Sequence, residues 1–344
     1  MVDISSYPAS SPAPRVDSLD RTDPRVAVVI PCYRVRGQIE SVLGEIGPEV
    51  SRIYCVDDAC PENSGELIEK AARTDSRIEL VRHAQNGGVG RAVVTGYRRA
   101  LEDGADIIVK LDGDGQMDAR KIGALVRKIA MGQADYVKGN RFFHLEHLKS
   151  MPWQRLIGNA GLSFLTKLST GYWNLFDPTN GFTAIHARVA RALPLAKLSD
   201  RFFFESDILF HLNTLRAVVV DVPMSARYGD EQSSLSPLKA LVEFPVHHAR
   251  NTLKRIFYSY FLRDFSMASV HLVVGGLLLL FGVSYGTMQW IHSSQLAQFA
   301  SSGTVMVAAL PVILGVQLLL NFIGFDMANI PRDPIHRGMD ASDF

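Results

Sequence analysis

The stretch Val26-Ala27-Val28-Val29-Ile30-Pro31-Cys32-Tyr33 decides the fold. Its apolar run has no polar residue at alternate positions, which is typical of a strand buried on both faces of a parallel sheet. Four more short β-branched runs follow, and each is separated from the next by a segment of helix length. These runs are Arg52–Val56, Ile78–Val81, Asp106–Leu111 and Tyr136–Lys138. The alternation predicts an α/β fold with a mostly parallel sheet covered by helices on both faces.

Acidic residues follow two of the predicted strands. Asp57 and Asp58 come after the second strand, and the sequence from Asp112 to Gln116, with Asp114 between, comes after the fourth. A single aspartate at such a place is often a turn former or helix cap. Two acidic pairs on the edge where parallel sheets bind ligands instead favour a binding site. Carboxylates two residues apart on a loop suit Mg²⁺ or Mn²⁺ that is shared with substrate phosphates.

The sequence Asn86-Gly87-Gly88-Val89-Gly90 lies at a predicted strand-to-helix turn. Backbone N–H groups and a helix N-terminus at such a turn can bind a phosphate. The segment lacks the Gly-Lys-Ser/Thr ending of a P-loop and the last glycine of a dinucleotide fingerprint. An ordinary glycine turn is therefore an equally good interpretation.

Charge is distributed unevenly along the chain. The 36 Lys and Arg nearly balance the 35 Asp and Glu, so there is no basic excess of the kind that nucleic-acid-binding domains carry. The 61 residues from Phe265 to Phe325 contain no charged side chain. Two apolar runs in this gap, about 270–291 and 304–325, would each span about 33 Å as helices at ~1.5 Å per residue. They predict a membrane hairpin; buried core helices are the alternative, but these are usually shorter and carry a polar face.

The segment before the first apolar run, residues 236–265, mixes cations with aromatic residues, as amphipathic interfacial helices beside anionic headgroups do. We expect Pro237 and Pro245 to divide it into short helices. The cations are Lys239, Arg250, Lys254, Arg255 and Arg263.

The flanks of the two apolar runs predict the topology. Arg332 and Arg337 follow the second run, whereas the loop between the runs has no Lys or Arg. The positive-inside rule then places both termini and the large N-terminal part in the cytoplasm, which makes the chain a multi-pass protein of the inner or plasma membrane. Residues 1–24 are expected to be a disordered lead-in, residues 25–235 the catalytic domain, and residues 329–344 a cytoplasmic tail.

Several motifs, taken together, resemble glycosyltransferase family 2 in order and spacing. They are Val28–Tyr33, Val56–Asp58, Leu111–Gln116 and Gly139–Arg141. A narrower resemblance to polyprenyl-phosphate glycosyltransferases, the group that includes dolichyl-phosphate mannose synthase, rests on three further segments. These are Asp177–Phe182, Phe203–Asp207, and Arg227 followed by Ser233-Ser234-Leu235. The paired C-terminal apolar runs are frequent in the bacterial members.

This resemblance implies a GT-A fold with three sets of site residues. The nucleotide-sugar would be held by Pro31, Tyr33, Asp57 or Asp58, and Asp112. A divalent metal, Mg²⁺ or Mn²⁺, would be held by Asp114, Gln116 and Asp112. The acceptor phosphate or diphosphate would be held by Arg141, Arg155 and Arg227. Glu205 and Asp207 join Asp112 and Asp114 as candidate catalytic residues. The chain departs from the pattern at Arg34-Val35, where many members have Asn-Glu, and at Ser234, where many have Lys. Other cations, such as Lys239, would then contact the lipid phosphate.

The expected reaction is inverting transfer of a sugar from a UDP- or GDP-linked donor to a polyprenyl phosphate, undecaprenyl or dolichyl phosphate, for a cell-envelope glycan or glycolipid modification. A phosphate monoester is mostly dianionic at neutral pH, so it can attack the anomeric carbon without a strong base. Glu205 and Asp207 either remove a proton or orient sugar hydroxyls or an arginine.

Three other functions are weighed against this one. A processive polysaccharide synthase usually carries a Gln-x-x-Arg-Trp motif and more membrane spans, and the sequence has neither of these features. A nucleotidyltransferase needs a Gly-rich basic loop after the first strand, and the sequence lacks this loop too. An inactive membrane scaffold remains possible on fold alone. Small residues at Gly275, Gly276 and Gly282 favour close packing between protomers, so a homo-oligomer is expected.

Overall fold

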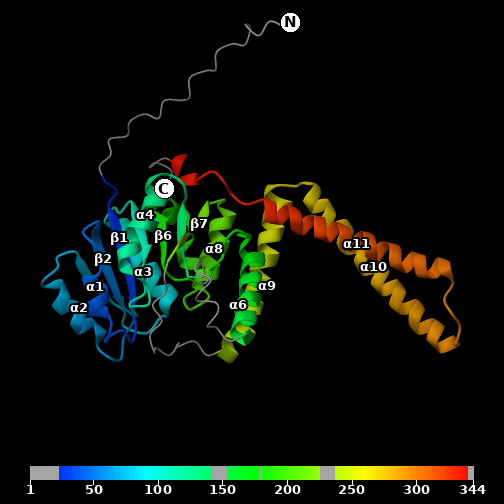
Figure 1. Cartoon of the computed structure of the whole chain (residues 1–344), viewed down its shortest axis with the longest axis horizontal. Helices are drawn as coiled ribbons and strands as arrows, with labels where there is room; N and C mark the ends of the chain where they lie inside the picture. The colour runs from blue at the N-terminus through cyan, green and yellow to red at the C-terminus, as the bar shows by residue number, and fades with distance from the viewer. Residues whose placement is uncertain (1–22, 142–152, 179, 225–236, 340–344) are drawn as a thin grey trace, which may run out of the picture.

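The structure is a computed structural model that describes residues 23–141, 153–178, 180–224 and 237–339, with the backbone alone at 153–159 and 237–242. A seven-stranded sheet in the order β3-β2-β1-β4-β6-β5-β7 forms its centre (Figure 1). Every neighbouring pair is parallel except the two pairs that involve β6. The strands are β1 (Val26–Cys32), β2 (Val50–Asp57), β3 (Ile78–Arg82), β4 (Ile107–Lys110), β5 (Tyr136–Asn140), β6 (Thr183–His186) and β7 (Val219–Pro223).

Helices cover both faces of the sheet, as predicted. One apolar core lies under α1 (Ile39–Gly44), α2 (Ser64–Ala72) and α4 (Ile122–Ala130). The opposite core lies under α3 (Val89–Glu102), α7 (Ala187–Ala192) and α8 (Phe204–Thr214). Alternate residues of β1 enter the two cores, so the unbroken apolar run is explained by burial on both faces. Short 3₁₀ turns η1 (Ala119–Lys121) and η2 (Leu195–Lys197) complete this part of the fold.

The five predicted strands are confirmed, and two more are present. β6 has four residues, begins with Thr183 and ends with His186, and runs antiparallel between β4 and β5. A run this short carries little periodic signal. The edge strand β7 begins with the β-branched pair Val219-Val220, which is a strand signal in the sequence that was not among the predicted strands.

The segment between the sheet and the hairpin differs from the prediction. It forms one helix, α9 (Pro237–Phe257), followed by a π-helical stretch, η3 (Tyr258–Arg263). Pro237 occupies the first helical position, which suits proline, and Pro245 lies inside a continuous helix. Packing of α9 along α6 (Trp153–Thr170) and α8 compensates for the backbone hydrogen bond that Pro245 cannot make. The expected division into short helices is wrong.

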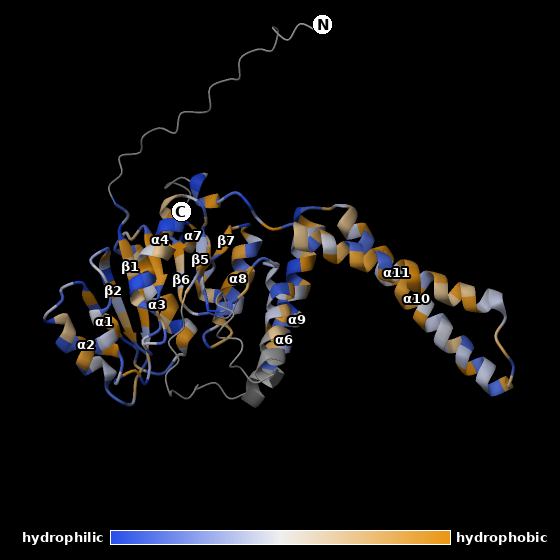
Figure 2. Ribbon diagram, viewed as in Figure 1, coloured by the Kyte–Doolittle hydropathy of each residue, from blue (hydrophilic) through white to orange (hydrophobic). Residues whose placement is uncertain are grey.

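Two long apolar helices form a hairpin that stands clear of the sheet (Figures 1 and 2). They are α10 (Met267–Leu296) and α11 (Ser302–Ala328), with mean hydropathies of 2.0 and 2.2, and both are long enough to cross a membrane. Only 22% and 11% of their most apolar windows are buried, which argues against core helices. The predicted spans lie inside these helices.

The glycines of the hairpin pack within the chain. A Cβ on Gly282 would overlap the backbone of α11, and one on Gly315 would overlap the backbone of α10; one on Gly275 would lie in tight contact, 3.0 Å from the carbonyl oxygen of Gly315. Their lack of side chains therefore serves contact between the two helices of one chain. Of the glycines on which the expected contact between protomers rested, Gly276 faces open space.

After the hairpin, the chain returns to the sheet. The 3₁₀ turn η4 (Ile335–Arg337) docks at the amino end of β5, where Asp135 accepts hydrogen bonds from the backbone N–H groups of Ile335 (3.0 Å) and His336 (2.9 Å). The His336 ring lies 2.6 Å from Asp135 and stacks on His186 at 4.3 Å. The described part of the C-terminal tail is thus packed against the sheet.

Candidate active site

The candidate site lies at the carboxyl ends of β1 and β4. The chain moves from β1 to β2 and β3 on one side and places β4 on the other side, so the direction of strand addition reverses between β1 and β4. Ligands of open α/β sheets bind in the crevice at such a reversal. The loop with Asp112 and Asp114 leaves β4 at this point.

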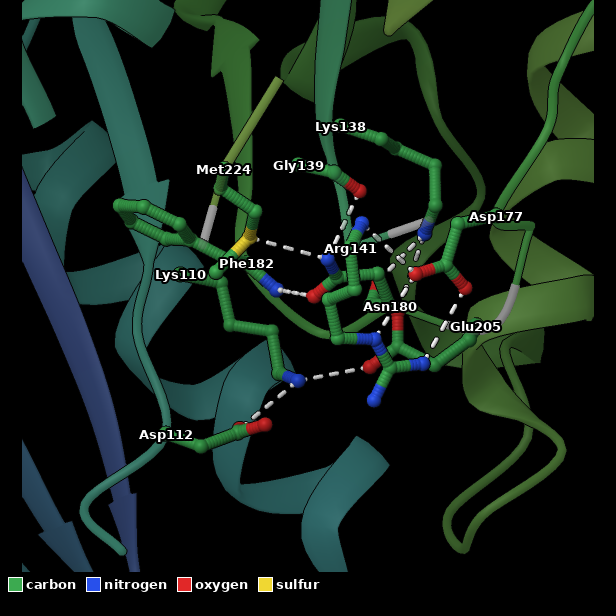
Figure 3. A network of polar contacts seen from close by, with 10 residues as sticks. All are labelled: Lys110, Asp112, Lys138, Gly139, Arg141, Asp177, Asn180, Phe182, Glu205 and Met224. Carbon is green, nitrogen blue, oxygen red and sulfur yellow. Dashed lines mark hydrogen bonds and ion pairs between the residues drawn. The ribbon is translucent and has the colours of Figure 1, made fainter. Parts of the chain in front are cut away.

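A buried lysine organises this edge of the sheet (Figure 3). Lys110, the last residue of β4, is 1% exposed, and its Nζ donates to Asp112 Oδ1 (2.9 Å) and Glu205 Oε1 (2.6 Å). Burial alone lowers the pKa of Lys110, but the two carboxylates raise it further, so the net pKa lies above the ordinary value. A Cβ on Gly181 would overlap both Lys110 and Asp112, which explains the glycine. Lys110 therefore joins the loop after β4 to the start of α8.

A second buried lysine lies beside the first. Lys138 on β5 is fully buried, and its Nζ donates to the carbonyl of Asn180 (2.6 Å) and lies 3.9 Å from Glu205 Oε2. Burial lowers the pKa of Lys138, with Lys110 acting in the same direction and the carboxylate of Glu205 opposing it. Within the part of the chain that the structure describes, Glu205 Oε2 is buried without a hydrogen-bond donor. Glu205 thus lies between two lysines, with one oxygen fixed by Lys110.

The arginine after β5 is fixed by a bidentate pair. Arg141 donates from Nε (2.8 Å) and Nη2 (3.1 Å) to the two oxygens of Asp177, which is fully buried. Asn180 holds the same loop, because its side chain donates to the carbonyl of Gly139 (2.7 Å) and accepts from the N–H of Phe182 (2.9 Å). The segment that contributed to the narrower resemblance therefore positions Arg141 at the same edge of the sheet as Lys110 (Figure 3).

Asp58 holds the glycine loop. Its carboxylate accepts from the N–H groups of Gly87 (2.8 Å) and Gly88 (2.7 Å) and lies 2.7 Å from the ring of His83. Asp58 is 2% exposed. These contacts favour the interpretation of the loop as an ordinary glycine turn, because Asp58 uses the two N–H groups.

Tyr33 is exposed at the end of β1, and the guanidinium of Arg34 lies 5.5 Å from its ring centroid. Arg34 has a left-handed backbone, with φ of 58°. Pro31 pairs with β2 within the sheet, and Asp57 accepts from the N–H of Cys60 (2.9 Å). The four predicted nucleotide contacts at the ends of β1 and β2 therefore differ in access, and Tyr33 is the most open of them.

The loop after β4 offers oxygen ligands to a divalent cation. Asp112 and Asp114 are both partly exposed, and Asp114 Oδ1 accepts from the N–H of Gln116 (3.0 Å). Among the described residues, no group of three or more His, Cys, Asp or Glu is close enough to hold a metal. Mg²⁺ is commonly held by one or two carboxylates together with substrate phosphates. The donor set on this loop fits such an ion.

The remaining predicted residues lie elsewhere or outside the described side chains. Asp207 is 7% exposed and accepts from the N–H of Ser199 (2.9 Å) and the side chain of Asn251 (3.1 Å), so its described contacts join α8 to α9. Arg155 lies in α6, where the structure describes only the backbone. Arg227 falls outside the described residues. The same is true of Ser233 and Ser234, and the side chain of Lys239 is not described.

Sequence reasoning missed Lys110 and Lys138. Each stands at or near the end of a strand whose preceding residues are apolar, Ile107–Val109 and Tyr136-Val137. A charge inside a buried strand requires a partner, because lysine is almost never fully buried alone. That signal was present in the sequence.

Comparisons with known proteins agree with this fold. The sequence model of "Glycosyl transferase family 2" matches residues 27–193. The chain is 26% identical over 245 residues to UDP-N-acetylglucosamine--dolichyl-phosphate N-acetylglucosaminyltransferase of Methanococcus voltae, which covers 67% of this chain and 97% of that protein. It is 28% identical over 204 residues to the undecaprenyl-phosphate mannosyltransferase of Micrococcus luteus, covering 58% of this chain and 83% of that protein.

Among solved structures, glucosyl-3-phosphoglycerate synthase from Mycobacterium tuberculosis, in complex with Mn²⁺, UDP-glucose and phosphoglyceric acid, aligns with a TM-score of 0.50 at 18% identity. The alignment covers 67% of this chain and 79% of the synthase, and it supports the GT-A fold. Residues 27–193 thus form a glycosyl transferase family 2 domain. The protein is a glycosyltransferase with two helices fit to span a membrane.

Proposed function

We propose that the protein transfers a sugar, with inversion, from a nucleotide-sugar to a polyprenyl phosphate at the cytoplasmic membrane face. The observation that carries this proposal is the arrangement around Lys110 and Arg141. Carboxylates of Asp112 and Glu205 and the guanidinium of Arg141 meet at one edge of the sheet. The names of the relatives from Methanococcus voltae and Micrococcus luteus, which act on dolichyl phosphate and undecaprenyl phosphate, support the acceptor class.

Asp114, Gln116 and Asp112 would hold a divalent cation, Mg²⁺ or Mn²⁺, on the donor diphosphate. When bound, such an ion neutralises the charge that develops on the leaving diphosphate. The Mn²⁺ in the structure of glucosyl-3-phosphoglycerate synthase supports the ion class. Asp112 keeps one oxygen on Lys110, which leaves its other oxygen for the donor side of the crevice.

The cations of the site would bind the acceptor phosphate. Arg141 is fixed by Asp177 and is still partly exposed, so it can present a guanidinium edge to a phosphate without losing its position. Arginine suits this task because its planar fork matches phosphate oxygens. Glu205, bound to Lys110, would orient a sugar hydroxyl, while the phosphate dianion attacks the anomeric carbon directly.

The hairpin and α9 support a lipid as the acceptor. α9 crosses the base of the hairpin (Figure 1), and its outward side exposes apolar side chains at Val246, Leu253 and Phe257 next to the cations Arg250 and Lys254. A helix of this kind lies in the membrane interface. The crevice would then meet a membrane-bound acceptor and a soluble donor together.

A donor screen tests the proposal. Purified full-length protein with Mg²⁺ or Mn²⁺ and a short polyprenyl phosphate is offered a panel of UDP- and GDP-linked sugars. The lipid product is identified by mass spectrometry, and its anomeric configuration by NMR. We expect one sugar to be added per lipid phosphate, with inversion, by the wild-type protein.

The matched variants are Asp114→Ala and Asp118→Ala, two carboxylates near each other on the chain. Asp118 binds Arg120 and caps η1, outside the proposed metal set. We expect Asp114→Ala to lose metal-dependent transfer and Asp118→Ala to keep it. Undiminished activity in Asp114→Ala would overturn the metal assignment, long polymeric products would favour a processive synthase, and no transfer with any donor would favour a scaffold.

A further inference from the structure

A buried ionic cluster joins the membrane hairpin to the catalytic part. Asp326, near the end of α11, is 4% exposed and is the first charged residue after the 61-residue gap. Its Oδ1 accepts from Arg255 Nη1 (2.6 Å) and the Tyr260 hydroxyl (2.6 Å). Its Oδ2 accepts from Arg255 Nη2 (2.9 Å) and Trp173 Nε1 (2.8 Å). One carboxylate therefore binds α9, η3 and the loop after α6.

This arrangement corrects one expectation from the sequence. Arg255 is 2% exposed, so it does not face lipid headgroups as the sequence analysis expected. It also donates to the carbonyl of Leu168 in α6 (2.9 Å). A Cβ on Gly171, which has φ of +76°, would crowd the same guanidinium. The chain around Arg255 is therefore shaped to hold Asp326.

The loop that Trp173 belongs to runs from this cluster to the active site. Beyond Trp173 it follows the edge strand β7, where Asn174 donates to the carbonyl of Val219 (3.2 Å) and the N–H of Phe176 donates to Asp221 (2.7 Å). The next residue is Asp177, which holds Arg141. We call residues 173–177 the strap. The strap leads over four residues from Trp173, which contacts the hairpin, to Asp177, which fixes Arg141.

We propose that Asp326 is a positioning residue that acts through the strap: by holding Trp173, the membrane hairpin sets the position of Asp177 and so the orientation of Arg141 toward the acceptor phosphate. The part of this inference that concerns the acceptor rests on the proposed function. The geometry supports the coupling because Asp177 is fully buried and both its oxygens bind Arg141. A displacement of the strap along β7 moves the guanidinium with it.

Two aromatic variants, each of which removes one hydrogen-bond donor to Asp326, separate this role from general stability. Trp173→Phe removes the Nε1–H donor on the strap and keeps an aromatic ring against Phe164. Tyr260→Phe removes the hydroxyl donor to the other oxygen of Asp326 and keeps the ring packed on Phe322. Each deletes one hydrogen bond to the same carboxylate, but Tyr260 is not on the strap. Asp326→Asn is the third variant and weakens the whole cluster.

Hydrogen exchange followed by mass spectrometry measures how often the strap opens in the full-length protein. We expect peptides that cover residues 173–177 and 139–141 to exchange faster in Trp173→Phe and Asp326→Asn, and at the wild-type rate in Tyr260→Phe. The loss of one hydrogen bond to a charged group corresponds to roughly tenfold faster local opening. Equal exchange in Trp173→Phe and wild type, or equal acceleration in Tyr260→Phe, would overturn the inference.

Steady-state kinetics of sugar transfer test whether the strap affects acceptor binding. We expect the KM for polyprenyl phosphate to rise roughly tenfold in Trp173→Phe, as for a lost charge-assisted contact, with the Kd for the nucleotide unchanged. An equal rise in Tyr260→Phe would show that the cluster acts through stability alone and would contradict the proposal. If the wild-type protein transfers no sugar to polyprenyl phosphate, the proposed function fails, and the exchange rates of the strap alone decide the inference.

Discussion

At the scale of single residues, Lys110 is the group on which the site depends. Replacing it by Met, in Lys110→Met, leaves the carboxylates of Asp112 and Glu205 facing each other without their shared cation. We expect a loss of roughly 3–5 kcal/mol in the free energy of unfolding, because a broken buried ion pair leaves an uncompensated charge. Transfer activity should fall with it. Denaturant titration and the transfer assay measure the two effects.

The control is Lys121→Met, at an exposed lysine beside α4. Substitutions at exposed sites of this kind change stability by less than about 0.5 kcal/mol. Equal stability of the two variants would show that Lys110 is not the organising cation.

Residue identity at the site was partly predictable from the sequence. The recurrence of aspartates after strands brought attention to Asp112 and Asp114, which the fold places at the reversal point of the sheet. The roles of Asp58 and Asp207 could not be read from the sequence in this way. Asp58 accepts hydrogen bonds from Gly87 and Gly88, and Asp207 accepts one from Asn251. These partners lie far away along the chain, so only the folded structure reveals them.

At the scale of elements, α9 carries the expected contact with the membrane. Its buried side holds His248, Asn251 and Arg255, and its exposed side holds Arg250 and Lys254. We expect the double substitution Arg250→Gln with Lys254→Gln to weaken the interaction with an anionic bilayer by about 1 kcal/mol per cation. The measurable result is a loss of stimulation by phosphatidylglycerol when transfer is compared in anionic and neutral vesicles.

The control for α9 is the double substitution Lys121→Gln with Lys128→Gln, which removes two exposed cations on the sheet side. It should retain the response to anionic lipid. A similar loss in both double variants would indicate a general charge effect rather than a contact made by α9.

Elements were predictable where their pattern was long and regular. The five parallel strands and the two apolar helices have such patterns. β6 was missed because a strand of four residues with polar residues at both ends carries little signal, and the continuity of α9 was missed because local proline chemistry argued against it. In α9, packing along α6 and α8 outweighs the local cost of Pro245.

At the scale of the whole molecule, the docked tail predicts a dependence of stability on pH. Burial, followed by the neighbouring His336 and Arg188, lowers the pKa of His186 to about 4, while Asp135 and Asp106 oppose the shift. The unfolded chain binds more protons between about pH 4 and pH 6.5, so stability falls as the pH drops through that window. The expected loss is about 2 kcal/mol between pH 7 and pH 5.

The measurement is chemical unfolding at pH 7 and pH 5 in wild type and in His186→Asn. Asparagine keeps an acceptor for the N–H of Arg188 at the start of α7 but does not titrate, so we expect a shallower loss on acidification. The control is His292→Asn, at an exposed histidine near the loop end of α10. An unchanged pH dependence in His186→Asn would contradict the assignment.

The tail contact itself could not have been foreseen. Asp135 and His336 are 201 positions apart, and neither stands in a motif. The sequence predicted a cytoplasmic tail over residues 329–344 but no contact for it, and the structure packs residues 335–337 on the amino end of β5.

The hairpin is consequently held to the sheet at both of its ends, by η3 and the cluster around Asp326 on one side and by the docked tail after α11 on the other. A protein anchored by a single flexible linker can adjust its height above the bilayer when the hydrocarbon thickness changes. This one has little freedom to do so, and a mismatch between hairpin and bilayer must be taken up by tilt of the whole molecule or by deformation of the lipid. Under the proposed function, the thickness of the surrounding membrane therefore becomes a variable that sets how far the candidate site stands from the acceptor headgroup.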